Sequence, residues 1–201
     1  MGEPAAERPG RGRPRSEKVR AAVLEAAADL LVEGGVDSVT MEAIAARAQV
    51  SKATLYKWWP SRAHVMLESF FSRNRHTIAV DEGASLAEVL ISQLASLTVA
   101  FRDTESGPLM ADLVAAAQAD GDIRDALDTQ WLRPRREVSA GLLRAAVERG
   151  ELDPRTDVAT AVDQLFAPVY YRLLMGHEPL HDELGATLVR QLLGGLRARE
   201  G

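Results

Sequence analysis

Residues 40–62, TMEAIAARAQVSKATLYKWWPSR, are the most informative part of the chain. Thr40 and Ser51 are helix-capping residue types, because each side-chain oxygen can accept a hydrogen bond from a backbone N–H two or three positions further on. An apolar pattern follows each of them, and Gln49-Val50 lies between the two patterns. The stretch therefore predicts two short helices joined by a tight turn.

The second of these helices has one apolar face and several polar ones. Leu55 and Trp59 stand four positions apart, so they share a face and are expected to lie in the core. The other faces carry polar, aromatic and basic side chains, namely Lys52, Thr54, Tyr56, Lys57 and Trp58. A short helix of this kind suits the major groove of DNA, where base edges present donors and acceptors to polar side chains. The two helices together predict a helix-turn-helix.

This stretch resembles the DNA-binding motif of the TetR family of transcriptional regulators. The positions that match are Thr40, Ile44-Ala45, Ala48, Val50-Ser51-Lys52, Thr54-Leu55-Tyr56 and Pro60-Ser61-Arg62. Trp58-Trp59 is one departure, since the family often has a histidine or aromatic residue followed by Phe at these positions. Gln49 is another, because it stands in the turn where the family usually has Gly. If this position takes a positive φ, Gln costs about 1 kcal/mol relative to Gly.

The candidate DNA contacts in this stretch are Thr40, Ser51, Lys52, Thr54, Tyr56, Lys57, Trp58 and Arg62. Lys52 and Thr54 are expected to contact base edges, and the three candidates that follow them on the helix are expected to contact phosphate or sugar. Thr40 and Arg62 lie at the starts of helices, where backbone N–H groups and the helix dipole favour a phosphate. The roles of Tyr56 and Arg62 are those that the resemblance implies. The alternative is a solvated charged face.

The net charge of −5 is unevenly distributed along the chain. Residues 1–62 hold ten Lys and Arg against eight Asp and Glu, whereas residues 63–201 hold 14 against 21. The positive surplus lies with the predicted helix-turn-helix. The acidic remainder would repel phosphate and keep DNA at one end of the molecule.

Residues 1–15 are rich in Pro, Gly, Arg and Ala and are predicted to form a flexible basic arm. Within this arm, the segment RGRPR at 11–15 resembles the core of an AT-hook. Arg11, Arg13 and Arg15 would enter a narrow A·T-rich minor groove from an extended backbone. The alternative is a solvated basic linker.

The composition argues against several other classes of protein and site. There is no cysteine, so disulfides, thiolate metal sites and cysteine nucleophiles are excluded. No apolar run approaches the roughly 20 residues of a membrane-spanning helix, and the arginine-rich N-terminus lacks the apolar region of a secretory signal, so we expect a cytoplasmic protein. Residues 177–181, HEPLH, match the H-E-x-x-H zinc pattern, but Pro179 and Gly176 oppose the continuous helix that this pattern needs. We predict a loop at this position and neither a metal nor a cofactor.

The rest of the chain has the periodicity of helices separated by Gly, Pro and Asp. In addition to the two helices of the motif, this periodicity predicts helices over about 17–33, 61–79, 84–103, 107–119, 122–149, 156–175 and 181–198. Pro134 is expected to kink or split the helix that contains it. The expected fold is all-α with about nine helices. A three-helix DNA-binding domain would occupy residues 16–62, and a larger ligand-binding and dimerisation domain residues 63–201.

The resemblance also implies a ligand pocket and a dimer interface in the C-terminal domain. TetR-like proteins enclose a small molecule in this region, and the candidate lining residues are Phe70, Leu94, Thr98, Phe101, Met110, Leu113, Gln130 and Trp131. The last two helices carry broad apolar stripes that could be intrachain core or could pair with a second copy in a four-helix bundle. The candidate interface residues are Ala161, Leu165, Phe166, Val169, Leu173, Leu188, Leu192 and Leu196.

These observations predict a TetR-like transcriptional regulator that binds a pseudo-palindromic DNA operator as a homodimer. Repression by occupying a promoter, with release by a small ligand, is the expected mode. One alternative is a DNA-binding regulator that activates transcription or answers to a protein partner and has no physiological small ligand. An enzyme with an accessory DNA-binding head is the alternative from another class, but no catalytic constellation in the sequence supports it.

Overall fold

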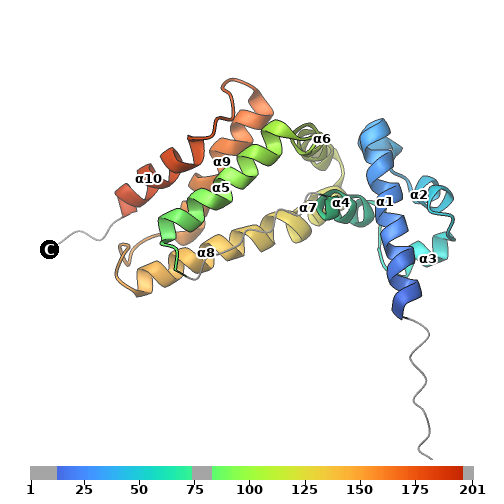
Figure 1. Cartoon of the computed structure of the whole chain (residues 1–201), viewed down its shortest axis with the longest axis horizontal. Helices are drawn as coiled ribbons and strands as arrows, with labels where there is room; N and C mark the ends of the chain where they lie inside the picture. The colour runs from blue at the N-terminus through green and yellow to red at the C-terminus, as the bar shows by residue number, and fades with distance from the viewer. Residues whose placement is uncertain (1–12, 74–82, 197–201) are drawn as a thin grey trace, which may run out of the picture. The chain divides into compact units, whose positions relative to one another are not determined.

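The computed structural model describes residues 13–73 and 83–196 (Figure 1). Within these ranges the regular secondary structure is helical and no strand is formed, so the predicted all-α fold is confirmed. No helix in the described ranges is long and apolar enough to cross a membrane. The chain divides between Ser69 and Phe70 into two units, which we describe one at a time.

The first unit contains α1 (Arg13–Ser38), α2 (Met41–Arg47), α3 (Lys52–Tyr56) and the first part of α4 (Arg62–Arg73). In this unit α2 packs against α1, and α3 packs against α2 (Figure 1). The apolar stripe predicted for the first helix forms the core together with residues of the other helices. The fully buried side chains include Val23, Ala27, Leu31, Ile44, Leu55 and Met66.

Helix α1 differs from its prediction at both ends. It begins at Arg13, so Arg13, Pro14 and Arg15 form its first turn and are not extended as the AT-hook resemblance predicts. Pro14 is compatible with this turn, because the first N–H groups of a helix have no intrahelical partner to lose. At the other end Gly35 has a φ of 68° and interrupts the helix, as the Gly34-Gly35 pair predicts. The boundary predicted between residues 15 and 16 therefore falls within the helix.

The turn between α2 and α3 is a Schellman motif centred on Gln49. The Val50 N–H donates to the Ala45 carbonyl at 3.0 Å, and the Gln49 N–H donates to the Ala46 carbonyl at 3.3 Å. Gln49 has a φ of 55° and is the one non-glycine residue with positive φ in the described part of the chain. The left-handed conformation that the family's usual glycine suggests is therefore present, with glutamine in place of glycine.

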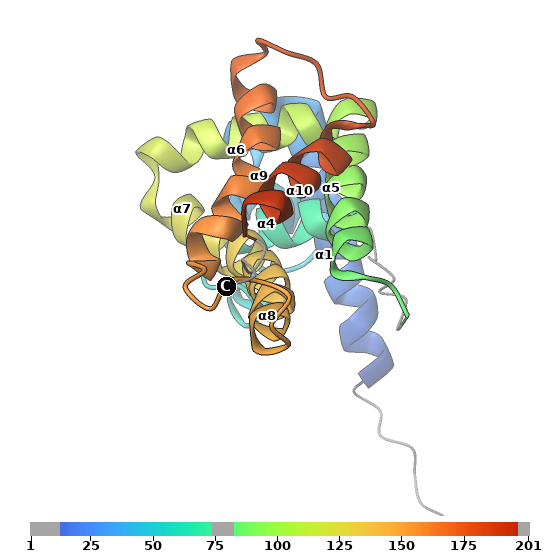
Figure 2. The ribbon, with the colours of Figure 1, turned by 90° about the vertical axis from the view of Figure 1, so that its left-hand side faces the viewer.

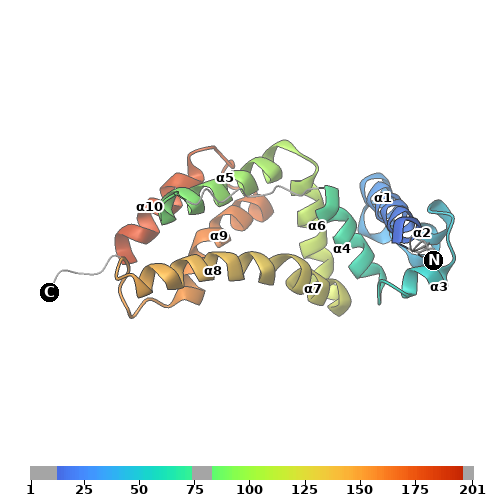
Figure 3. The same ribbon diagram turned by 60° about the horizontal axis from the view of Figure 1, so that its bottom comes forward.

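The second unit contains the end of α4 and the remaining helices, which are α5 (Leu86–Asp103), α6 (Ser106–Ala119), α7 (Gly121–Leu127), a π-helical turn (Asp128–Leu132), α8 (Arg133–Glu148), α9 (Val158–Met175) and α10 (Leu184–Leu196). Figures 2 and 3 show α10 running alongside α5. This approach is close because Gly185 has no side chain. A Cβ at this position would lie 2.9 Å from the Cβ of Leu94. Helix α9 packs against both α5 and α8 (Figure 3).

The helix predicted over 122–149 is divided by the π-helical turn. The Arg133 N–H donates to the Asp128 carbonyl, five residues back, and α8 then begins with Pro134 in its first turn. Proline inside a regular helix would lack a donor and clash with the carbonyl four residues earlier, so a wider turn just before it relieves the conflict. The turn also places Trp131 in the core, where it is 4% exposed.

Gln49→Gly should stabilise the first unit, because glycine enters the left-handed conformation without a steric cost. The gain should be about 0.5–1 kcal/mol after the larger unfolded-state entropy of glycine is subtracted. Urea unfolding followed by tryptophan fluorescence measures this change. The control is Ala48→Gly, whose φ of −77° is ordinary for alanine. The control should be destabilised by about 0.5–1 kcal/mol. A lower midpoint for Gln49→Gly would show that the glutamine side chain contributes more than its backbone costs.

Candidate functional site

Both helices of the predicted motif begin with the caps that the sequence predicts. The Ala43 N–H donates to Thr40 Oγ1 at 3.0 Å, and the Thr54 N–H donates to Ser51 Oγ at 3.2 Å. Ser51 and Thr54 also share a hydrogen bond between their hydroxyls at 2.9 Å. Each hydroxyl therefore stabilises the start of a helix, which is also the end at which a phosphate would be favoured.

The inner face of α3 is anchored by burial and by one carboxylate. Leu55 is fully buried and Trp59 is 3% exposed, which confirms their predicted core positions. Trp59 Nε1 donates to Glu68 Oε2 at 2.6 Å, and Arg20 of α1 binds the other oxygen of the same carboxylate. Glu68 of α4 thus joins the end of α3 to α1. Because Leu55 is buried and Glu68 binds both Trp59 and Arg20, α3 has little freedom to rotate about its axis.

Five of the predicted DNA contacts lie together on the outward faces of α3 and on the two residues that follow it. Lys52, Lys57 and Tyr56 are exposed, and the tyrosine ring is 56% exposed. Thr54 and Trp58 are half-buried, and the Trp58 ring packs edge-to-face on Trp59 with centroids 5.5 Å apart. We call these five residues the recognition surface. Large exposed aromatic and basic side chains on a helix that is fixed from behind suit contact with a polyanion.

Lys52 is held within the unit by an ion pair. Its Nζ lies 2.7 Å from Glu42 Oε1. The hydrogen bond between them raises the pKa of Lys52 and lowers the pKa of Glu42. Both side chains are more than half exposed, so the pair is weak and DNA can compete for the lysine. Lys57 has no carboxylate partner in the described part of the chain.

Arg62 is bound within the first unit and does not belong to the recognition surface. The Arg62 guanidinium donates to the carbonyls of Val36 and Val39, at 3.3 and 3.5 Å, and so ties the start of α4 to the link between α1 and α2. Its contact with phosphate stays a prediction. Arg11 lies outside the described residues, and the backbone of Arg13 and Arg15 lies in the first turn of α1.

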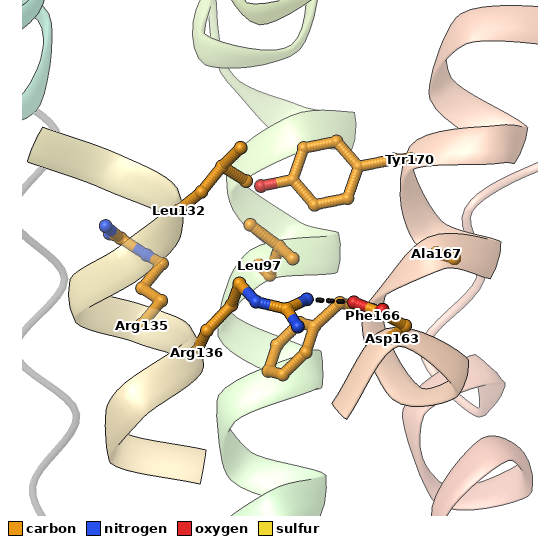
Figure 4. A pocket seen from close by; sticks show the side chains of 8 residues that line it. All are labelled: Leu97, Leu132, Arg135, Arg136, Asp163, Phe166, Ala167 and Tyr170. Atoms are coloured by element: carbon orange, nitrogen blue, oxygen red, sulfur yellow. Dashed lines mark hydrogen bonds and ion pairs between the residues drawn. The ribbon is translucent and has the colours of Figure 1, made fainter. Parts of the chain in front are cut away.

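The second unit contains a cavity of about 280 Å³ between α5, the π-helical turn, α8 and α9 (Figure 4). Its lining residues are Leu97, Leu132, Arg135, Arg136, Asp163, Phe166, Ala167 and Tyr170. A neighbouring cavity of about 210 Å³ shares Leu97, Arg135 and Phe166 with it and adds Gln93, Pro134 and Val138. We call the two together the chamber. Arg136 forms an ion pair with Asp163 across the chamber from α8 to α9 (Figure 4).

Arg135 is the most unusual side chain of the chamber. Its guanidinium carbon lies 3.0 Å from the centroid of the Trp131 ring and 5.9 Å from that of Phe71. No carboxylate pairs with it in the described part of the chain. Burial lowers the pKa of Arg135 to about 10, which leaves it protonated at neutral pH. Tyr170 lies nearby and accepts a hydrogen bond of 2.6 Å from Trp131 Nε1, and burial raises the pKa of its phenol.

None of the residues predicted to contact a ligand lines this chamber. Phe70, Leu94, Thr98, Phe101, Met110, Leu113 and Trp131 are buried in the second unit, and Gln130 is half-buried. Two of them lie just behind the chamber, since Phe101 packs edge-to-face on Tyr170 at 5.4 Å and Trp131 lies beneath Arg135. Their contact with a ligand stays a prediction. The chamber residues that were missed come from three distant segments, and no local pattern links them.

The predicted dimer interface needs correction at three positions. Ala161, Leu165 and Val169 are at most 2% exposed in the single chain, so they belong to the intrachain core and have no surface left to offer a second copy. The other candidates are half-buried, namely Phe166, Leu173, Leu188, Leu192 and Leu196. The exposed apolar residues at the end of α9 are Tyr171, Leu174 and Met175, at 58%, 39% and 62%. An apolar stripe on a helix predicts that its residues are buried. It does not indicate whether the same chain or a second copy of the chain covers them.

Both units match known families. Residues 23–68 match the bacterial regulatory proteins of the tetR family, and residues 80–192 match the tetracyclin repressor-like C-terminal domain. The HTH-type transcriptional regulator YdeS of Bacillus subtilis is 36% identical over 188 residues, which cover 94% of each chain. The DNA-binding transcriptional repressor TetR of Mycobacteroides abscessus is 28% identical over 182 residues, 89% of this chain and 94% of the relative. The crystal structure of the TetR family regulator SCO0332 has 38% sequence identity and a TM-score of 0.74, over 90% of this chain and all of that one.

Changing each of the two lysines of the recognition surface to alanine should affect DNA binding in a different way. Lys57→Ala removes a predicted phosphate contact, so it should weaken binding to all DNA sequences alike and reduce the salt slope of binding by about one unit. Lys52→Ala removes a predicted base contact, so it should relax sequence preference at one position by about 1–3 kcal/mol. Fluorescence anisotropy with DNA duplexes at several salt concentrations measures both effects.

Arg149→Ala is the matched control, since it removes one positive charge from a residue of the second unit that pairs with Glu151. It should change neither the slope nor the preference. If Lys57→Ala alters sequence preference at an unchanged salt slope, the two roles are assigned wrongly.

Proposed function

This chain belongs to the TetR family of transcriptional regulators, and we propose that it is a homodimeric repressor that leaves its operator when a small molecule binds the second unit. The recognition surface of α3 carries this proposal. Its residues would enter the major groove, with Lys52 and Thr54 at base edges and Tyr56, Lys57 and Trp58 on the backbone. A twofold dimer carries two such surfaces, and it would therefore read a pseudo-palindromic site.

The anchoring of α3 supports the proposal that this helix recognises base edges. A recognition helix must keep its side chains in register with base edges, so it gains from a fixed rotation and a fixed depth. The buried Leu55 and the bonds that meet at Glu68 provide both. The similarity to the DNA-binding repressor of Mycobacteroides abscessus supports repression as the outcome of operator binding.

The chamber supports control by a small molecule. Sites for small molecules are concave, mostly apolar and upward of roughly 300 Å³, with a few polar groups. The larger cavity, at about 280 Å³, adjoins the smaller one of about 210 Å³. A ligand that prefers one arrangement of these helices shifts the population toward it. The loss of DNA affinity can then equal, but not exceed, the difference in its affinity for the two arrangements.

Selection of bound sequences from random DNA with the purified protein tests the operator proposal. We expect a pseudo-palindromic consensus whose half-sites have equal spacing in all selected clones. Cloning the consensus upstream of a reporter then distinguishes repression from activation. Selection of sequences with a single half-site, or of none, would contradict the proposal.

The basic arm should add affinity at particular operators. Deleting residues 1–12 removes Arg8 and Arg11 and leaves α1 whole. Binding should weaken chiefly at operators whose flanks are A·T-rich, because arginines are favoured in a narrow minor groove. Anisotropy with A·T-flanked and G·C-flanked versions of one operator measures the difference. Equal affinities of the full and the shortened chain on both duplexes would exclude a minor-groove role.

The exposed apolar residues of α9 and the half-buried leucines of α10 should lie in the dimer interface. Leu192→Asp and Tyr171→Asp each place a carboxylate there, which should weaken dimerisation by about 3 kcal/mol or more. Sedimentation over a range of concentrations should show monomers. Operator binding should fall because a monomer has one recognition surface and makes half of the contacts. Tyr171 is 58% exposed in the single chain, so its change should leave the monomer folded.

The control is Val99→Asp on α5, which changes a side chain that is 40% exposed and lies on a different helix. This variant should remain a dimer. If Tyr171→Asp and Leu192→Asp both remain tight dimers, the interface lies elsewhere.

A further inference from the structure

The Tyr170 hydroxyl has a hydrogen-bonding capacity that the chain does not use. Its oxygen accepts a hydrogen bond of 2.6 Å from Trp131 Nε1, and an indole N–H can only donate. The phenol proton must therefore point elsewhere, and no acceptor for it lies among the residues that the structure describes. Figure 4 shows the hydroxyl directed from α9 toward Leu132, and both residues line the larger cavity. A hydrogen-bond donor is thus available to a molecule that occupies this cavity.

A second unused polar group lies at Gln93, which is 4% exposed and lines the smaller cavity. Its Oε1 accepts a hydrogen bond from Ser139 Oγ at 2.8 Å, while its Nε2 has no partner. If the amide is turned, Nε2 donates to the serine and Oε1 is left without a partner instead. Buried polar groups are almost always paired in folded proteins, so one polar atom of this amide remains for another molecule.

The charges around the chamber offer no partner to an ionised group. Arg136 and Asp163 pair with each other. The Arg135 guanidinium lies over the Trp131 ring, and Figure 4 shows it turned away from Tyr170. The rest of the lining is mostly aliphatic or aromatic. An ionised ligand would leave water without gaining a counter-ion, which costs far more than burying an uncharged polar group that finds a hydrogen bond.

We propose that the chamber binds an uncharged, elongated and mostly apolar molecule, with a hydrogen-bond acceptor such as a carbonyl oxygen on Tyr170 and a second polar group on Gln93. This inference rests on the proposed function, because it names the chemical class of the effector. The order of the groups follows from the two cavities. Tyr170 lines only the larger one, and Gln93 lines only the smaller one. Leu97 and Phe166 line both, so the apolar body of the ligand would lie along these two residues.

The acceptor is tested with 2-nonanone and 2-methyl-1-nonene, which differ only in that a CH₂ group replaces the carbonyl oxygen. Tyr170→Phe should weaken binding of the ketone to the full-length protein about fivefold, the net size of one neutral hydrogen bond. It should leave binding of the alkene unchanged, which also shows that the variant keeps its fold. Both ligands are volatile, so their depletion from the vapour above the protein solution measures both affinities.

Tyr171→Phe is the matched control, since it removes the same hydroxyl from the adjacent residue, which is 58% exposed and lies outside the lining of the chamber. It should change neither affinity. Equal losses for the ketone and the alkene in Tyr170→Phe would overturn the assignment of the acceptor to Tyr170. The same loss for the ketone in Tyr171→Phe, or no binding of the ketone up to its solubility limit, would also overturn it.

The preference for an uncharged ligand is tested with nonanoate, which has the same number of carbon atoms as 2-nonanone. At neutral pH nonanoate should bind at least about tenfold more weakly than the ketone, because its carboxylate finds no counter-ion in the chamber. Calorimetric titration of the full-length protein measures the affinity of nonanoate. Binding of nonanoate as tight as that of the ketone, or tighter, would overturn the proposal.

The second polar group is tested with 9-hydroxy-2-nonanone. Gln93→Leu should weaken binding of this hydroxyketone about fivefold relative to 2-nonanone, because the hydroxyl then enters an apolar cavity without a partner. Equal effects on both ketones would overturn the role of Gln93.

Operator binding separates this inference from the proposed function. If the protein binds its selected operator but not 2-nonanone, the inference about the chamber fails and the proposed operator binding stands. If 2-nonanone binds as described but no operator is selected, the inference about the chamber stands and the proposed function fails.

Discussion

A helix of five residues cannot hold its shape in water, and the recognition surface lies on such a helix. Helix α3 depends on tertiary contacts for its existence as well as for its orientation. Leu55 supplies the buried area, and the Trp59 indole, bonded to Glu68, fixes the end of the helix. The polar residues of α3 can face outward because these two inner residues account for its stability. The constraint also explains why the left-handed turn at Gln49 matters, since that turn sets the point from which α3 leaves α2.

The parts of this fold that the sequence predicts well are those set by local chemistry. The caps at Thr40 and Ser51 each depend on residues three positions away, and Gly35 ends a helix through its own backbone. The buried positions of Leu55 and Trp59 follow from spacing along one helix. Side-chain partners from distant segments were not predictable. Nothing in the pattern around Glu68 indicates that it receives bonds from both Trp59 and Arg20, because that meeting depends on how three helices pack.

The chamber shows the same limit more severely. Its walls come from α5, the π-helical turn, α8 and α9, and the turn itself arises from a conflict around Pro134 that sequence predicts only as a kink or break. The large apolar and aromatic residues chosen as a ligand lining are mostly core, since a stripe of such residues is buried whether or not a ligand is present. The informative residues were polar ones in apolar surroundings, Gln93 and Tyr170. A related reason applies to Ala161, Leu165 and Val169, which were predicted for the interface. They are buried within the single chain, so they have no surface for a second copy to cover.

Helix α9 connects the chamber to the interface proposed for the dimer. Helix α9 contributes Phe166 and Tyr170 to the chamber, and its next residues, Tyr171 and Leu174, are the exposed apolar ones proposed for the interface. The free energy passed along this route is limited by the preference of the ligand for one arrangement over the other. An effector that bound both arrangements equally would leave the operator occupied, however tightly it filled the chamber.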